Sequence, residues 1–188
     1  MVIGYGLKGM ASSRERILER LRPTVGSGLH PGAAAPSKFA EGDLWAAFEG
    51  FLVALGGRII SREELTGVLE KRCLIEPAAA KVLGIPPVTD EIWDVEVGVS
   101  FADLAIAETG TLVVSSGEGK LRMSSLAPPV NVMVVSRQSI VATLAEAIPR
   151  IPPATSVLIT GPSRTADIEG ILVRGVHGPG ELLVYVYE

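Results

Sequence analysis

The fold is decided by residues 58–83, which read RIISREELTGVLEKRCLIEPAAAKVL. The apolar runs at 58–60 and 73–75 have the length of short strands. Between them, Ser61-Arg-Glu-Glu64 is a capping box, in which the serine and glutamate side chains satisfy free backbone N–H groups at a helix start. Pro77 suits the first position of a second helix, because its missing N–H has no partner there in any case. Strand, helix, strand and helix in this order predict a parallel sheet with helical crossovers.

Towards the N-terminus, apolar residues over 44–55 have helical spacing and predict a further helix, which Gly56-Gly57 ends. Another capping box, Ser12-Ser-Arg-Glu15, predicts a short helix that ends before Pro23. Residues 24–40 are rich in Gly, Pro, Ala and Ser and are typical of a linker. We therefore expect an N-terminal helix and flexible linker over residues 1–40 and one α/β domain over 41–188.

Towards the C-terminus, the apolar segments 104–107 and 111–115 flank Thr109-Gly110, and this turn predicts an antiparallel hairpin. The expected fold class is therefore α/β, with a mostly parallel sheet, helices on both faces and one hairpin. The remaining predicted elements are strands at 95–99, 130–135, 156–160 and 182–187, and helices at 136–148 and 167–173.

Composition and charge exclude several classes of function. The 188 residues carry 17 basic and 21 acidic side chains, a net charge of -4, and no basic stripe for nucleic acid. No apolar run approaches the roughly 18 residues of a membrane span, and the N-terminus lacks a secretory pattern, so we expect a cytoplasmic protein. Cys73 is the single cysteine, and His30 and His177 lie far apart in the sequence, so we expect no metal or iron–sulfur cofactor in this chain.

The most suggestive polar segment runs from Gly161 to Glu169, after an apolar strand. Ser163, Arg164 and Thr165 are donors suited to a carboxylate or phosphate beside a helix N-terminus. A ligand would then lie at the carboxyl end of a strand, where open α/β sheets bind ligands. The alternative is that Ser163 or Thr165 caps the helix, Asp167 favours its dipole and Arg164 is solvated.

A second candidate is Glu108, which precedes Thr109, Gly110 and Thr111 in the hairpin turn. The carboxylate suits a base or a nucleophile, with the two threonine hydroxyls as hydrogen-bond donors. The alternative is a structural turn in which Glu108 pairs with a nearby arginine.

Two further groups are candidates. His177 lies between glycines in Gly175-Val-His-Gly-Pro179, and an imidazole can exchange a proton near neutral pH, although a lone histidine is more often structural. Arg122, Ser124 and Ser125 follow the loop 117–119 and suit either an anion or a network of loop hydrogen bonds.

Taken in order, these segments resemble the LUD-domain family, that of lactate utilisation protein C (LutC/YkgG). The resemblance covers Trp93 to the C-terminus. Its most specific part is the nine-residue segment from Gly161 to Glu169. One departure is the run Ser125-Leu-Ala-Pro-Pro-Val-Asn131, because the family usually shows Ser-Leu-Leu-Pro followed by a histidine. The segments that carry the resemblance are 105–113, Arg122 with Ser124-Ser-Leu126, 161–169 and 175–179.

The resemblance implies the NagB/RpiA/CoA transferase-like fold and a role in oxidising L-lactate to pyruvate. The partners would be iron–sulfur subunits of a lactate utilisation complex, and this chain would hold a small carboxylate or phosphate-bearing ligand. Glu108 or His177 would move a proton, while Arg122 or Arg164 would hold the carboxylate. The alternatives are a stand-alone isomerase or acyl/CoA-transferase-like enzyme with Glu108 as base or nucleophile, and a non-catalytic assembly subunit.

Overall fold

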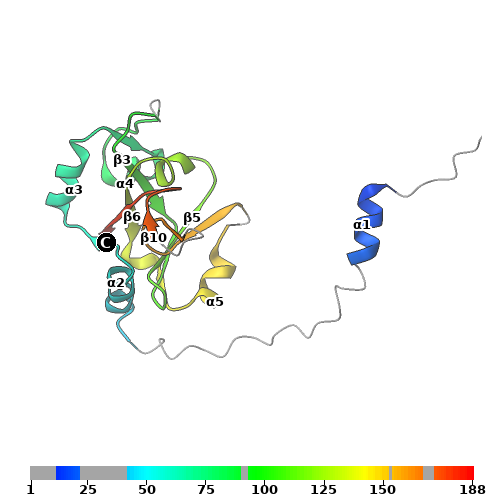
Figure 1. Ribbon diagram of the computed structural model, residues 1–188. Helices are drawn as coiled ribbons and strands as arrows, with labels where there is room; N and C mark the ends of the chain where they lie inside the picture. Colours follow the sequence, from blue (N-terminus) through cyan, green and yellow to red (C-terminus); the bar gives the residue numbers. More distant parts are fainter. Residues whose placement is uncertain (1–11, 22–41, 90–92, 153, 167–171) are drawn as a thin grey trace, which may run out of the picture. The chain divides into compact units, whose positions relative to one another are not determined.

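The computed structural model describes residues 12–21, 42–89, 93–152, 154–166 and 172–188 (Figure 1). The chain divides into two compact units, Met1–Ala35 and Pro36–Glu188. In the first unit, helix α1 (Ser13–Leu21) begins with the predicted capping box. The Ser12 N–H donates to Glu15 Oε2 at 2.6 Å, and the Glu15 N–H donates to Ser12 Oγ at 3.3 Å.

The second unit is built on a five-stranded sheet in the order β1-β11-β6-β3-β2. Every neighbouring pair of strands in this sheet is parallel, which confirms the prediction of a parallel sheet. The central strands are mostly apolar because both faces of the sheet are buried. The strands are β1 (Arg58–Ile59), β2 (Cys73–Ile75), β3 (Val97–Ala102), β6 (Val130–Ser136) and β11 (Glu181–Tyr187).

Helices cover both faces of this sheet, as predicted (Figure 1). Helix α3 (Arg62–Leu69), which starts at the predicted Ser61 capping box, and α4 (Pro77–Leu83) pack on one face. Helix α2 (Leu44–Ala54) packs on the other through Phe48 and Leu52. Among the described residues, no helix is both long and apolar enough to cross a membrane.

A second sheet, in the order β7-β4-β5-β8, shares the core with α2. The predicted hairpin is confirmed, because β4 (Leu104–Ile106) pairs antiparallel with β5 (Thr111–Ser115). Strand β8 (Ser156–Ile159) pairs antiparallel with β5 and is the half-exposed edge of this sheet. The strand predicted at 156–160 is therefore confirmed, but its apolar residues are only partly buried because only one side of β8 faces the core.

The helix predicted at 136–148 is largely absent. Within 136–148, Ile140 and Val141 form strand β7 (Ile140–Val141) beside β4. Val141 is buried in the cluster that contains Leu104 and Ile106, whereas Ile140 packs against the cluster that contains Phe48 and Leu52. Only α5 (Leu144–Ala147) is α-helical there. Of the helix predicted at 167–173, the described residues Leu172 and Val173 lie instead in strand β10 (Leu172–Arg174), which pairs antiparallel with β9 (Arg164–Ala166). Residues 167–171 lie outside the described residues. The described residues also contain three short 3-10 helices, η2 (Arg122–Ser125), η3 (Arg137–Ser139) and η4 (Ile148–Arg150).

Candidate functional site

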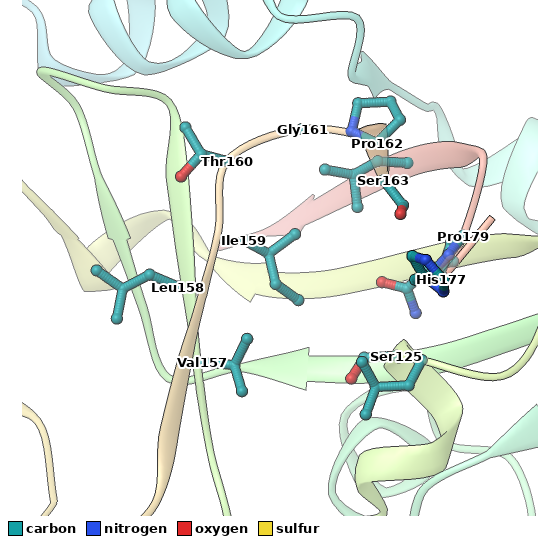
Figure 2. Close-up of a pocket in the computed structure, with 14 residues that line it drawn as sticks. Ser125, Val157, Leu158, Ile159, Thr160, Gly161, Pro162, Ser163, His177 and Pro179 are labelled. Atoms are coloured by element: carbon teal, nitrogen blue, oxygen red, sulfur yellow. The ribbon is translucent and has the colours of Figure 1, made fainter. Parts of the chain in front are cut away.

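A pocket of about 220 Å³ lies between the two sheets and combines several segments singled out in the sequence (Figure 2). Strand β8 forms one wall, where Val157 and Ile159 point towards the cavity and Leu158 points away. Ser125, Ser163 and His177 lie opposite. The lining residues are Ser125, Leu126, Asn131, Val157, Leu158, Ile159, Thr160, Gly161, Pro162, Ser163, His177, Gly178, Pro179 and Leu182.

The floor of the pocket lies at the amino ends of the parallel strands. Asn131 is the second residue of β6, and its neighbour in register is Leu182, the second residue of β11. From the sequence we expected a ligand at the carboxyl end of the strand before Gly161, as in open parallel sheets. Gly161 does follow β8, but β8 belongs to the second sheet and pairs antiparallel, so the rule for parallel sheets does not apply to it.

The turn that begins at Gly161 and the loop that contains His177 are held together by backbone contacts. The Ser163 N–H donates to the Pro179 carbonyl at 2.8 Å, and the Gly175 N–H donates to the Ser163 carbonyl at 3.0 Å. A Cβ on Gly178 would lie 3.3 Å from Ser163 Cβ, so glycine permits this close approach. Ser163 and His177 therefore reach the same pocket from separate segments.

Arg164 serves the architecture of this turn. Its guanidinium donates to the carbonyl of Leu55, the C-cap residue of α2, where a positive charge complements the helix dipole. Gly161 has a φ of +112° and approaches the same carbonyl. Arg164 does not line the pocket; Thr165 lies in β9, and Asp167 lies outside the described residues.

The three candidates of η2 separate into different roles. Ser125 lines the pocket, and its hydroxyl donates to the Arg122 carbonyl at 3.0 Å. Ser124 is fully buried and donates to the Leu121 carbonyl at 2.6 Å. The Arg122 side chain is exposed and is not among the lining residues. A Cβ on Gly98 would lie 1.7 Å from the Ser124 carbonyl oxygen, so this glycine lets η2 rest directly on β3.

The hairpin turn lies outside the pocket. Glu108 Oε1 accepts a hydrogen bond of 2.7 Å from the N–H of Leu144, the first residue of α5, so the carboxylate caps this helix. The partner of Glu108 is thus the backbone of Leu144 and not the arginine that the structural alternative expected. The hydroxyls of Thr109 and Thr111 are 2.7 Å apart, and that of Thr111 is 2.8 Å from Thr160, which does line the pocket.

Asn131 and Glu76 are site-forming residues that the sequence reasoning missed. Each is buried to 1% exposure, and each had a detectable signal: Asn131 is a lone amide inside an apolar strand, and Glu76 directly follows one. Glu76 accepts hydrogen bonds from the N–H groups of Phe101 at 2.5 Å and Leu121 at 3.0 Å. These bonds tie the segment that leads into η2 to the sheet.

The charges and donors around the pocket restrict what it can bind. Among the described lining residues, His177 is the only ionisable side chain. Over the described part of the chain, no three His, Cys, Asp or Glu side chains are grouped as a metal ion requires. The polar groups that face the cavity are thus hydroxyls, an imidazole and an amide, set against apolar walls from β8 and Leu182.

A parallel sheet covered by helices on both faces, with a second sheet and an open pocket between the two sheets, defines a small α/β domain with a ligand-sized site. Residues 87–187 match the family model described as LUD domain, and the chain belongs to this family. Every residue that lines the pocket falls within the matched stretch.

Curated relatives carry the name lactate utilization protein C. The protein from Geobacillus sp. (strain WCH70) is 40% identical over 92 residues, which cover 44% of this chain and 38% of that protein. The Bacillus subtilis (strain 168) protein is 39% identical over 92 residues, with the same coverage. The Halalkalibacterium halodurans protein is 33% identical over 111 residues, 47% of this chain and 48% of that protein. The chain thus spans less than half of each relative.

A solved structure has the same fold. The crystal structure of a DUF162 family protein from Deinococcus radiodurans superposes with a TM-score of 0.55 at 23% sequence identity. The match covers 80% of this chain and 99% of that one. At this level of identity the comparison supports the fold alone.

Proposed function

We propose that this chain is the ligand-binding component of a lactate utilisation system and holds a small hydroxy or oxo acid in the pocket between its sheets. The observation that carries the proposal is the position of the pocket. All of its lining residues lie within the stretch that matches the LUD domain, and the relatives that share this domain are named for lactate utilisation.

The pocket chemistry suits such a ligand. The apolar side chains of Val157, Ile159 and Leu182 accommodate a methyl group, and the hydroxyl of Ser163 can donate to a carboxylate. His177 is the residue we assign to proton exchange, because it lines the pocket whereas Glu108 is engaged on Leu144.

Electron transfer is assigned to partners. A four-thiolate iron–sulfur cluster needs four cysteines, and Cys73 is the only cysteine of this chain. We therefore propose that iron–sulfur subunits receive the electrons while this chain binds and orients the acid. A stand-alone isomerase or acyl-transfer enzyme would need Glu108 free to act, and no contact of Glu108 favours that alternative.

A gene deletion tests the proposal in an organism that has no other lactate dehydrogenase. We expect growth on L-lactate to be lost, growth on glucose to continue, and the intact gene to restore growth on L-lactate. A pull-down of the tagged chain from lactate-grown cells should bring down cysteine-rich partners. Unchanged growth on L-lactate after deletion would contradict the proposal.

A further inference from the structure

The floor of the pocket holds a hydrogen-bond acceptor that the fold leaves unused. Asn131 is 1% exposed and lines the pocket, and its Oδ1 has no hydrogen-bond partner among the described residues. Within that part of the chain it is the only buried side-chain nitrogen or oxygen without a partner. Buried polar atoms are almost always paired in native proteins, so this oxygen calls for an explanation.

The other half of the amide shows that the oxygen is correctly placed. Asn131 Nδ2 lies 3.1 Å from each of three acceptors: the Gly98 carbonyl, the Ser100 hydroxyl and the Ser124 carbonyl. Two of these are carbonyl oxygens, which can only accept. A flipped amide would set its oxygen against both carbonyls, so the nitrogen must face the sheet and η2, which leaves the oxygen to the pocket side.

The same network holds Asn131 in a single orientation. The Ser100 hydroxyl, which accepts from Nδ2, is itself 2.8 Å from the Ser124 hydroxyl, and Ser124 Oγ lies 3.5 Å from Glu76 Oε2. All four residues are buried. An amide fixed from behind in this way cannot turn to meet a ligand, so the ligand must supply the matching group.

An unpaired buried acceptor destabilises the fold, and a donor from water or from a ligand removes that penalty. The cavity of about 220 Å³ has room for a small organic molecule. A ligand hydroxyl can replace a water at Oδ1 without loss. A ligand carbonyl cannot, because it would place a second acceptor against the first and displace the donor.

We propose that Asn131 Oδ1 accepts a hydrogen bond from a ligand hydroxyl, so that the pocket selects the hydroxyl-bearing member of a hydroxy/oxo pair. The acceptor assignment comes from the geometry of Asn131 alone. The identity of that member as L-lactate in preference to pyruvate rests on the function proposed above. Val157, Ile159 and Leu182 would then surround the carbon skeleton, and Ser163 would face its carboxylate.

Two ligand pairs of matched size test the inference on the full chain. Isotope-labelled protein is titrated with 2-propanol and acetone, and separately with L-lactate and pyruvate, while amide resonances of the pocket segments are followed by NMR. We expect each hydroxyl compound to bind at least about tenfold more tightly than its oxo partner, because a site that pairs with a hydroxyl rejects the analogue without one. The Asn131 side-chain amide signals should shift with the hydroxyl compounds only.

Asn131→Leu should abolish the preference in both pairs, and its folding is checked from the dispersion of the amide spectrum. If this variant fails to fold, the affinities of the wild-type chain for the hydroxyl and oxo compounds still test the inference. Equal affinities within each pair overturn the inference, even if L-lactate binding leaves the proposed function standing. A preference for 2-propanol without any binding of L-lactate supports the acceptor and overturns lactate as the ligand. Binding of none of the four compounds overturns both.

Discussion

Glu76 is a carboxylate that the fold buries almost completely between a strand and the segment leading into η2. Burial raises the pKa of Glu76 above its ordinary value of 4.5. The N–H groups of Leu121 and Phe101 and the charge of Lys120 oppose this shift, while the charge of Asp103 adds to it. Lys120 lies 3.0 Å from Asp103 in an ion pair. The side chain therefore stabilises local structure at some electrostatic cost.

The raised pKa predicts how Glu76 affects stability as a function of pH. Below 4.5 the group is protonated in the folded and unfolded chains, and its contribution is fully present. As pH rises through the folded pKa, that contribution is lost, because the unfolded chain ionises first. We expect the unfolding free energy of the wild type, relative to Glu76→Gln, to fall with rising pH and then level off. Urea titrations of both proteins at a series of pH values measure this difference; a difference that rises with pH would contradict it.

Cys73 is expected to be unreactive in the folded protein. Its side chain is buried in β2, and its Sγ lies 3.7 Å from the Val68 carbonyl. Burial and the nearby charge of Glu96 raise the pKa of the thiol, so little thiolate is present at neutral pH. We predict that a thiol reagent labels native Cys73 at least about tenfold more slowly than the urea-unfolded chain. Equal rates would show that the thiol is accessible.

At the scale of elements, the turn of the β4–β5 hairpin fits against α2 through Gly110. This glycine has a φ of +62°, and a Cβ there would lie 2.4 Å from the Leu52 backbone nitrogen. Because Leu52 belongs to the core cluster that spans both sheets, displacing α2 would disturb the packing between them. The hairpin and the helix thus depend on one another.

We predict that Gly110→Ala lowers the unfolding free energy by about 2–4 kcal/mol, through left-handed backbone strain and the clash with Leu52. Gly67→Ala in α3 is the matched control, since a Cβ there meets nothing within 4 Å. The control should be neutral or stabilising by up to about 1 kcal/mol. Chemical denaturation measures both, and similar effects of the two substitutions would refute the proposed contact.

Elements with a local cause were predictable from the sequence. Ser61 with Glu64 and Pro77 begin helices through contacts within a few residues, and Thr109-Gly110 closes its hairpin in the same way. The spacing of apolar residues predicted a helix at Ile140. In the structure Ile140 pairs in a strand with Ala105, which is far away in the sequence. Local pattern cannot reveal such a partner.

The site likewise has features with a local cause, which the sequence shows, and features that depend on contacts between distant segments, which it does not. Gly161 and Ser163 were one candidate in the sequence and His177 was another, and the structure brings them to one pocket through backbone hydrogen bonds between their segments. Arg164 was expected to hold an anion, yet its partner is a helix carbonyl 109 positions earlier in the chain. Asn131 is defined as a site residue only by its unpaired oxygen, which depends on three acceptors from other segments.

At the scale of the whole molecule, the pocket and the three hydrophobic clusters are formed by residues from Leu44 onwards. Leu44 is the first residue of α2 and lies within the unit Pro36–Glu188. The unit Met1–Ala35 contains α1, a helix of 9 residues. An isolated helix shorter than about 12–15 residues is marginal in water. Stability and ligand binding should therefore reside in the second unit.

We predict that a chain lacking residues 1–35 unfolds at the same temperature as the full chain, and with the same dependence on urea. The dependence on urea reports the surface exposed on unfolding, which should change little if the removed unit contributes no core. Differential scanning calorimetry and urea titration of the two chains make the comparison, and titration with 2-propanol tests whether the pocket is retained. A lower midpoint, or a loss of binding, would show that the first unit packs on the second and helps to form its site.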